Sequence, residues 1–111
     1  MKRIALGILV LALAAPLAAA TWKNVSLMDG SCAMKKKDAA NPDAHTRACA
    51  LQCAKAGYGA VMDGKFIKFD EKGNELAKAA LLKSDKKDHL RATIDGDMKD
   101  GVIHVSSLTL D

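Results

Sequence analysis

The chain has 111 residues, and its 17 lysine and arginine side chains exceed its 13 aspartate and glutamate side chains, for a formal net charge of +4. This length supports one small domain with a modest hydrophobic core. Without Lys2 and Arg3, which lie in a segment that we expect to be removed, 15 basic residues face 13 acidic ones and the net charge is +2. Such a small excess gives no reason to expect nucleic acid as a partner.

Residues 1–20 have the pattern of a secretory signal peptide. A short basic start precedes an apolar run over residues 4–13, and the alanines of residues 18–20 resemble a peptidase cleavage site. The apolar run is too short for a good membrane span, and the alanine-rich end disfavours the alternative of an uncleaved membrane anchor. We therefore expect cleavage after Ala20. The mature domain, residues 21–111, is expected to be periplasmic or secreted, without a stable membrane span.

The first half of this domain is expected to contain one strand and one helix. The strand lies in TWKNVSLMDGSC, residues 21–32, where aromatic and β-branched residues favour extended structure until an Asp-Gly pair breaks the run. The polar and charged residues 33–43 are expected to form an exposed loop. A helix follows over residues 42–56, with Asn41 as its amino-terminal cap, Pro at its first position and Gly57 just beyond its end.

The second half is expected to contain four strands and one helix. Residues 58–70 read as a hairpin, because an Asp-Gly pair separates two apolar runs. A second helix, capped by Asn74, is expected to end near residue 84. A strand over residues 89–95 and a last strand over residues 102–110 complete the domain. The alternation of the last strand slips before Leu108, which suggests a bulge.

The order strand, helix, strand, strand, helix, strand, strand predicts a mainly β fold with two helices, in the α+β class. If the first helix is an insertion, a five-stranded barrel with a helix between its third and fourth strands remains. That is the layout of the OB-fold. A small barrel also limits the number of exposed strand edges. An open α+β sheet with both helices on one face is the alternative.

Three motifs resemble those of small secreted bacterial proteins with OB-fold-like domains. They are DGSC at residues 29–32, CALQC at residues 49–53 and GYGAVMDGKF at residues 57–66. In such proteins we expect a cysteine after the first strand, a helix with Cys-x-x-x-Cys and a Gly-Tyr pair at the start of the next strand. The resemblance covers most of residues 22–110. It implies an OB-fold-like five-stranded barrel with an inserted Cys-bearing helix, rather than a function.

Three cysteines remain in the mature domain, and three cannot all pair within one chain. On the expected helix, His45, Cys49 and Cys53 follow one another at steps of four and share one slowly drifting stripe. Neighbours at this spacing have Cβ atoms about 5–6 Å apart, whereas a disulfide needs roughly 3.5–4.5 Å. Cys49 and Cys53 are therefore better placed to share a metal ion than to bond each other. Cys32 is the natural extra ligand.

Thiolate ligands favour one Cu(I) or Zn ion over harder ions. We predict a non-catalytic metal-binding or metal-handling site at Cys32, Cys49 and Cys53, completed by His45 or Met34. A Met34 thioether would favour Cu(I). The sequence contains no phosphate loop and no Gly-x-Ser-x-Gly motif, and we do not expect an enzyme. The oligomeric state stays open.

Two other interpretations of the cysteines stay open. A disulfide from Cys32 to Cys49 or Cys53 would staple the helix to the barrel and stabilise it by about 2–4 kcal/mol. The protein would then be an interaction module that binds a protein or a small ligand on the barrel face. A leftover cysteine would instead suit a thiol-redox protein.

The lysine-rich residues 35–37 and 83–89 read as solvated surface, because single-stranded nucleic acid needs aromatic stacking platforms that this chain largely lacks.

Overall fold

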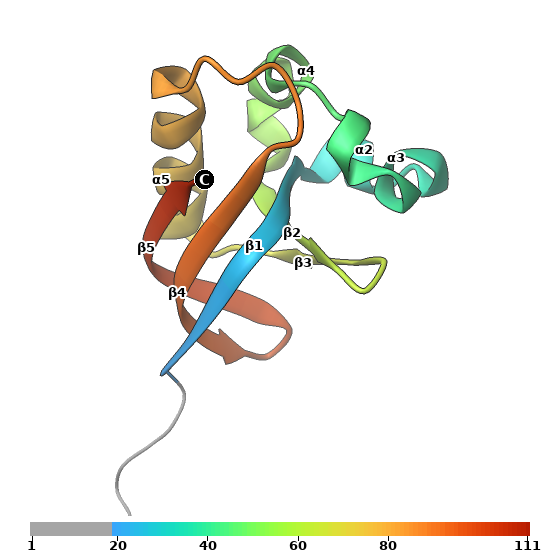
Figure 1. Cartoon of the computed structure of the whole chain (residues 1–111). Coiled ribbons are helices and arrows are strands. Elements are labelled where there is room, and N and C mark those ends of the chain that lie inside the picture. The colour runs from blue at the N-terminus through green and yellow to red at the C-terminus, as the bar shows by residue number, and fades with distance from the viewer. Residues whose placement is uncertain (1–18) are drawn as a thin grey trace, which may run out of the picture.

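Figure 1 shows the fold of the chain in a computed structural model, which describes residues 19–111. Residues 1–18 of the predicted signal peptide lie outside the described residues. Five strands form one sheet in the order β3-β2-β1-β4-β5, and each neighbouring pair in this order is antiparallel. The strands are β1 (Ala19–Asp29), β2 (Tyr58–Met62), β3 (Lys65–Lys68), β4 (Arg91–Lys99) and β5 (Val102–Leu110).

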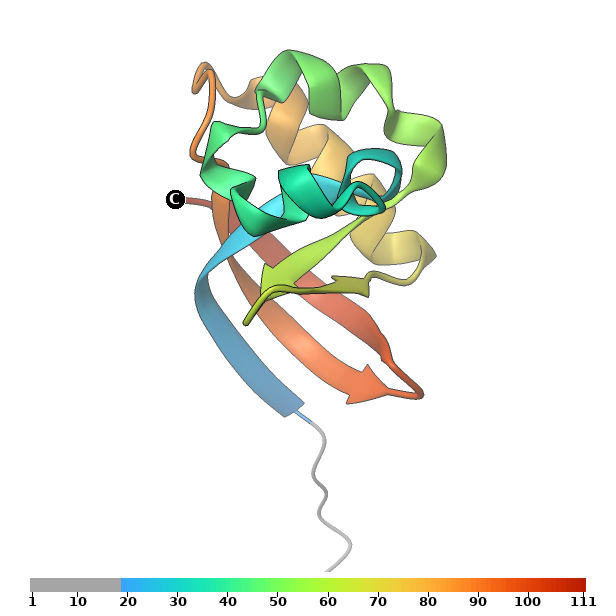
Figure 2. The same cartoon turned by 90° about the vertical axis from the view of Figure 1, so that its right-hand side faces the viewer.

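Short helical elements accompany the sheet, and all of them except α5 lie between β1 and β2. They are α2 (Gly30–Ala33), α3 (Lys36–Ala40), α4 (Arg47–Gln52), α5 (Glu71–Lys83) and the 3-10 turns η1 (Pro42–Ala44) and η2 (Ala54–Ala56). Figures 1 and 2 show the run from α2 to η2 across one end of the sheet, beside the last turns of α5. The domain is thus mainly β with a few short helices, which agrees with the predicted α+β class.

The hairpin between β2 and β3 has the predicted Asp-Gly turn. Asp63 and Gly64 have φ angles of 51° and 76°, and Met62 pairs with Lys65 across the turn. Positive φ at both central residues is the mark of a type I′ turn, whose twist matches that of the flanking strands. The structure therefore confirms this hairpin.

The last strand has one more residue than its partner at one point. Asp95 pairs with Ser107 but the next residue, Gly96, pairs with Val105, so Ser106 is left without a partner on β4. This is the bulge that the broken alternation before Leu108 predicted. A bulge bends its strand and increases the local twist, and β5 packs against α5 on its way along the sheet.

The core lies between the sheet and α5. Alternate residues of β4 and β5, namely Ala92, Ile94, Ile103 and Val105, are buried, as their alternation in the sequence predicts. Leu81 of α5 is fully buried against them. Because complete burial of an Ile or Leu side chain contributes roughly 1.5–3 kcal/mol, this contact is strong enough to hold α5 on the sheet.

The helix α5 begins earlier than predicted, and Asn74 does not cap it. Asp70 is the cap, and its Oδ1 accepts a hydrogen bond from the Gly73 N–H at 3.0 Å. Asn74 lies inside the helix and its Oδ1 accepts a hydrogen bond from the Tyr58 N–H at 2.7 Å. Gly73 is needed for close packing, since a Cβ there would lie 2.6 Å from Cγ2 of Val105. Two tertiary contacts are therefore at work: packing against Val105 explains the glycine, and the bond to Tyr58 explains why Asn74 is not the cap.

The predicted helix over residues 42–56 is broken into three pieces. The 3-10 turn η1 ends before His45, whose φ and ψ angles of −71° and 132° are extended. Helix α4 begins after Thr46, and Thr46 Oγ1 accepts a hydrogen bond from the Cys49 N–H at 3.2 Å. Thr46, and not Asn41, is therefore the cap of this helix. His45 lies outside the helix and does not share a helical stripe with the two cysteines.

The stretch predicted as an exposed loop is partly helical. Helix α3 occupies five of its residues, Lys36–Ala40. Cys32 also belongs to a short helix, α2, because β1 ends at Asp29. The pair Asp29-Gly30 ends the strand as predicted, but it also starts a helical turn, since the Asp side chain caps the backbone that follows.

Candidate metal centre

Asp29 joins the end of β1 to the first turn of α2. Its Oδ2 accepts a hydrogen bond from the Cys32 backbone N–H at 2.9 Å, which is the usual bond of a helix cap. The Gly30 N–H donates to the Gly57 carbonyl oxygen at 2.9 Å. A Cβ at Gly30 would lie 2.8 Å from the Ala56 carbonyl oxygen, so a larger residue would push α2 away from η2.

His45 approaches the same carboxyl group from the segment between η1 and α4. Its Nε2 lies 2.6 Å from Oδ1 of Asp29. Asp29 is fully buried and His45 is only 7% exposed. Buried polar groups are costly unless they are hydrogen-bonded, and these two satisfy each other. The break in the helix at His45 allows its ring to turn inward to this partner.

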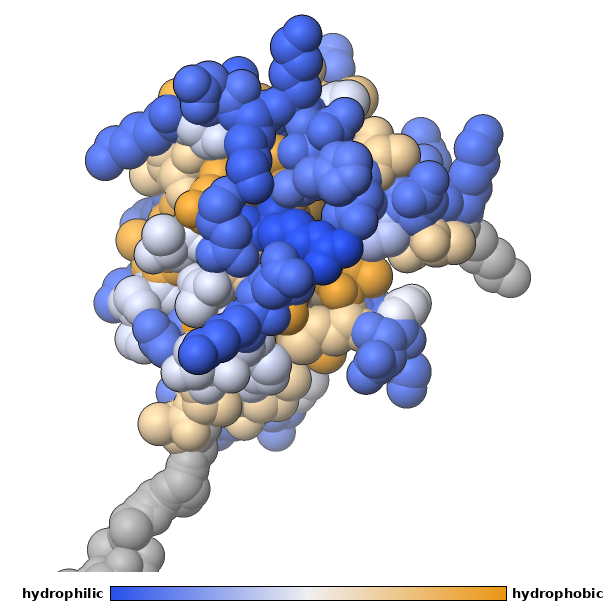
Figure 3. Space-filling model, in the orientation of Figure 1, coloured by the Kyte–Doolittle hydropathy of each residue, from blue (hydrophilic) through white to orange (hydrophobic). Residues whose placement is uncertain are grey.

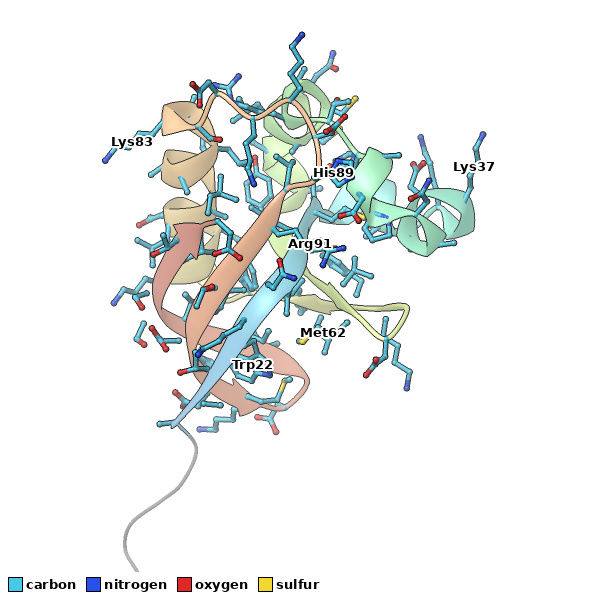
Figure 4. The ribbon with its side chains drawn as sticks, in the orientation of Figure 1. Trp22, Lys37, Met62, Lys83, His89 and Arg91 are labelled. Carbon is cyan, nitrogen blue, oxygen red and sulfur yellow. The ribbon has the colours of Figure 1, made fainter. Side chains whose placement is uncertain are left out.

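Two arginines hold the chain on either side of His45. Arg91 of β4 donates from Nε and Nη2 to the two carboxyl oxygens of Asp43, at 2.9 and 2.7 Å, and thereby holds the pKa of Asp43 below its ordinary value. Arg47 donates from Nε to the Leu81 carbonyl oxygen of α5 at 2.6 Å. Figure 4 shows Arg91 and His89 where β4 meets the short helices. The position of His45 is thus tied to the sheet and to α5.

Asp29, Cys32 and His45 together form a group of metal-binding side chains. Each offers one ligand atom, and these atoms all lie within 4.8 Å of one another. The group combines a carboxylate oxygen, a thiol sulfur and an imidazole nitrogen, which are the three ligand types that zinc accepts in proteins. The group can therefore hold one metal ion.

A pocket of about 340 Å³ opens beside this group. Cys32 and His45 line it from the inside, and the exposed Cys49 of α4 lines it from the outside. Lys35, Lys37 and Asn41 also line it. Figure 4 shows Lys37 projecting from the outer end of this segment, and Figure 3 shows mainly hydrophilic side chains over the same end of the molecule. The group is thus buried behind a polar opening.

The surroundings of Cys32 favour its protonated form. Burial raises the pKa of the Cys32 thiol to about 11, with further upward contributions from the charges of Asp29, Cys53 and Asp38 and an opposing one from Lys35. Without a cation, Cys32 therefore keeps its proton at neutral pH. A bound metal ion reverses this balance, because it takes the place of the proton on the sulfur.

The structure brings together some of the predicted ligands. Cys32 and His45 belong to the close group, and Cys49 lies on the wall of the same pocket. Cys53 follows the last residue of α4 and contributes to the raised pKa of Cys32, but it does not line the pocket. Neither Cys49 nor Cys53 is a member of the close group. Met34 is 86% exposed and does not line the pocket. Among residues 19–111 all three cysteines are free.

Asp29 is the member of the group that the sequence analysis missed. It was interpreted only as the residue that ends the first strand. A signal was present, because an aspartate three residues before Cys32 has the spacing of a helix cap, and a capping side chain must lie beside the residue whose N–H it accepts.

Within the part of the chain that the structure describes, no helix has the length and apolar character needed to cross a membrane. Comparison with known proteins gives no matching family model, no matching curated protein and no matching solved structure. The functional assignment therefore depends on the geometry of the site.

Proposed function

We propose that the protein is an exported metal-binding protein that holds one Zn²⁺ ion between Asp29, Cys32 and His45, with Cys49 as the fourth ligand. The observation that carries the proposal is the close grouping of three different ligand types, with ligand atoms within 4.8 Å. Two of the three side chains are buried. Four ligands are what a tetrahedral zinc site requires, and the wall of the pocket offers Cys49 as the fourth.

The composition of the group favours zinc over Cu(I). Cu(I) selects thiolate and thioether ligands, whereas zinc accepts oxygen, nitrogen and sulfur together. The carboxylate of Asp29 adds a hard ligand, and the thioether of Met34 is directed to solvent rather than to the pocket. The Cu(I) alternative would need the exposed side chain of Met34 to turn inward.

Binding of an ion requires Asp29 and His45 to move slightly apart and Cys49 to turn toward the close group, of which it is not a member. Neighbouring ligand atoms in a tetrahedral zinc site lie about 3.3 Å apart or more, given metal–ligand bonds of about 2.0–2.3 Å. Nε2 of His45 and Oδ1 of Asp29 are 2.6 Å apart, so the ion replaces their hydrogen bond and separates them by roughly 0.7 Å. Zinc thus takes over a contact that the metal-free fold already makes.

We further propose that the domain is an OB-fold-like barrel on which this site is an insertion. A parallel bridge between Phe69 and Ile103, and the hydrogen bond from the Asp70 N–H to the Ile103 carbonyl oxygen at 3.0 Å, bring the end of β3 to β5. The helix α5 lies between β3 and β4, as the OB-fold layout requires.

Export to the periplasm or beyond the cell is proposed from the pattern of residues 1–20 alone.

The two other interpretations of the cysteines have less support. A structural staple needs a disulfide from Cys32 to Cys49 or Cys53, and all three cysteines are free in the described chain. Thiol-redox chemistry needs a reactive thiolate, and because burial raises the pKa of Cys32 to about 11, only the other cysteines could supply one. The metal-binding proposal uses the free thiols, and a bound ion would have to displace the proton that Cys32 otherwise keeps.

Zinc titration of the chain, followed by native mass spectrometry and by thermal unfolding, tests the proposal. We expect one ion per chain and a higher unfolding temperature, because the ion binds the folded form. Cys32→Ser and His45→Gln are expected to lower the zinc affinity by more than the roughly 10–100-fold that loss of an orienting group costs.

Matched controls separate these ligands from neighbours of the same type. Cys53→Ser and His89→Gln replace a cysteine and a histidine that neither belong to the close group nor line its pocket, and they are expected to keep the zinc affinity. Absence of any bound zinc in the unaltered chain would refute the proposal. Equal losses in Cys53→Ser and Cys32→Ser would refute the ligand set.

A further inference from the structure

The proposed zinc ligands differ steeply in their exposure to solvent. Asp29 is fully buried, His45 is 7% exposed, Cys32 is half-buried and Cys49 is exposed. An ion held by this set is shielded from solvent on the side of the sheet. It is accessible to solvent on the side of Cys49. Any exchange of ligands must therefore begin at Cys49.

The opening of the pocket has an unusual charge for a metal site. Lys35 and Lys37 are exposed at its edge, and Asp38 is the one acidic side chain among the residues that line it. A lysine pair repels a free metal cation and attracts an anion. The charge at the opening therefore suits an anionic molecule that carries or accepts the ion, rather than the hydrated cation.

The pocket is also large enough to hold more than an ion. Its volume of about 340 Å³ lies within the range of sites for small molecules, roughly 300–1,000 Å³. The side-chain amide of Asn41 adds a hydrogen-bonding group at the edge. We infer that the pocket admits a small thiol that bears carboxylate groups, and that this thiol replaces Cys49 at the bound ion, so that zinc passes between the protein and small thiolate carriers.

The exchange is a ligand substitution without oxidation or reduction. The incoming thiol releases its proton to solvent and its sulfur bonds to zinc, while the bond from zinc to Cys49 breaks and the Cys49 sulfur takes up a proton. One thiolate thus replaces another, so the charge of the atoms bonded to the ion does not change, and the carboxylates of the incoming thiol stay near the lysines. The inference rests on the proposed function, since it needs zinc at Asp29, Cys32 and His45.

The test measures zinc release from the zinc-loaded chain into a chromogenic chelator, with glutathione as the anionic thiol and 2-mercaptoethanol as the neutral one. The rate ratio between the two thiols is compared in the unaltered chain and in Lys35→Gln/Lys37→Gln. We expect the ratio to fall roughly threefold to tenfold in the variant, and to fall in the unaltered chain at high salt. Lys72→Gln/Lys99→Gln, which removes one exposed lysine of α5 and one of β4 that do not line the pocket, is expected to keep the ratio.

Cys49→Ser provides the second measurement. If Cys49 is the exchangeable ligand, this variant still binds zinc but releases it faster, and the rate no longer depends on the thiol. An unchanged rate ratio in Lys35→Gln/Lys37→Gln, or loss of all zinc binding in Cys49→Ser, would overturn the inference while leaving the zinc site intact. Failure of the unaltered chain to bind zinc would instead overturn the proposed function.

Discussion

Oδ1 of Asp29 and Nε2 of His45 lie 2.6 Å apart in the interior, although the two residues are 16 positions apart in the sequence. This bond joins the end of β1 to the segment before α4. A hydrogen bond to a charged group contributes about 1.5–3 kcal/mol, and loss of one buried partner leaves the other unsatisfied. The bond therefore has consequences for stability that do not depend on a metal.

Asp29→Ala, which leaves His45 without its buried partner, is expected to lower the free energy of unfolding of the metal-free chain by about 1.5–3 kcal/mol, measured by urea denaturation. The chain offers a close control, because Asp88 and His89 form a similar pair at 2.9 Å on the surface. Exposed pairs contribute little, so Asp88→Ala is expected to leave stability nearly unchanged. Equal effects of the two variants would contradict the structural role of Asp29.

The raised pKa of Cys32 predicts a specific order of reactivity in the metal-free chain. With a pKa of about 11 the thiolate of Cys32 is scarce at pH 8, so iodoacetamide is expected to modify the exposed Cys49 well before Cys32. The rate at Cys32 is expected to rise until the pH approaches 11. Mass spectrometry of each cysteine against pH measures this, and the difference should vanish in urea. A Cys32 that reacts as fast as Cys49 at pH 8 would contradict the described surroundings.

The same shift predicts how stability changes at alkaline pH. The unfolded thiol ionises near its ordinary pKa of 9.0 and the folded thiol near 11. The contribution of Cys32 is fully present below pH 9.0 and is lost as the pH rises toward 11, because the unfolded chain then gives up its proton first. Cys32→Ser is therefore expected to reduce the fall in stability over this interval, as followed by urea denaturation. If Cys32→Ser leaves the slope of stability against pH unchanged, the pKa of Cys32 is not raised in the folded chain.

Arg91 and Asp43 predict the opposite dependence at acidic pH. Arg91 holds the pKa of Asp43 below its ordinary value of 3.8, mainly through a hydrogen bond. Their contribution is present above that value and is lost as the pH falls through the lowered one. The difference in urea midpoint between the unaltered chain and Arg91→Gln is expected to shrink below pH 4. Lys68→Gln, at an exposed position, should have the same urea midpoint as the unaltered chain both above and below pH 4.

Asp70 provides a prediction that concerns the fold alone. Its Oδ1 accepts hydrogen bonds from the Gly73 N–H at the start of α5 and from the Val105 N–H of β5. Asp70→Ala is expected to cost about 1–2 kcal/mol in urea denaturation, since the helix loses its cap. Asp70→Asn keeps an acceptor and should recover most of that loss, while Glu75→Ala, on the exposed face of α5, should cost little. A negligible effect of Asp70→Ala would contradict this account of the helix start.

The strands were predictable because their signals are local. The turn at Asp63-Gly64, the buried alternation around Ile94 and the bulge at Ser106 all follow from neighbouring residues. The helix starts were less predictable, because Asn74 has the right chemistry for a cap but bonds to the distant Tyr58 N–H instead. Which of two capping residues is used depends on tertiary packing, and a single sequence does not contain that information directly.

The candidate site was partly predictable for the same reason. Cys32 and His45 were recognised from their residue types, but the reason given for His45 was wrong, since it does not lie on a helix with Cys49. A four-residue spacing implies a shared face only where the helix continues, and Thr46 starts a new one. Asp29 was missed because its contact with His45 spans 16 residues.

X-ray absorption spectroscopy at the zinc edge of the reconstituted chain tests the proposed site most directly. Zinc–sulfur bonds of about 2.3 Å are distinct from zinc–nitrogen and zinc–oxygen bonds of about 2.0–2.2 Å. We expect two sulfur neighbours, from Cys32 and Cys49, and two nitrogen or oxygen neighbours, from His45 and Asp29. Three sulfur neighbours, or none, would contradict this ligand set and the central place of Asp29 in it.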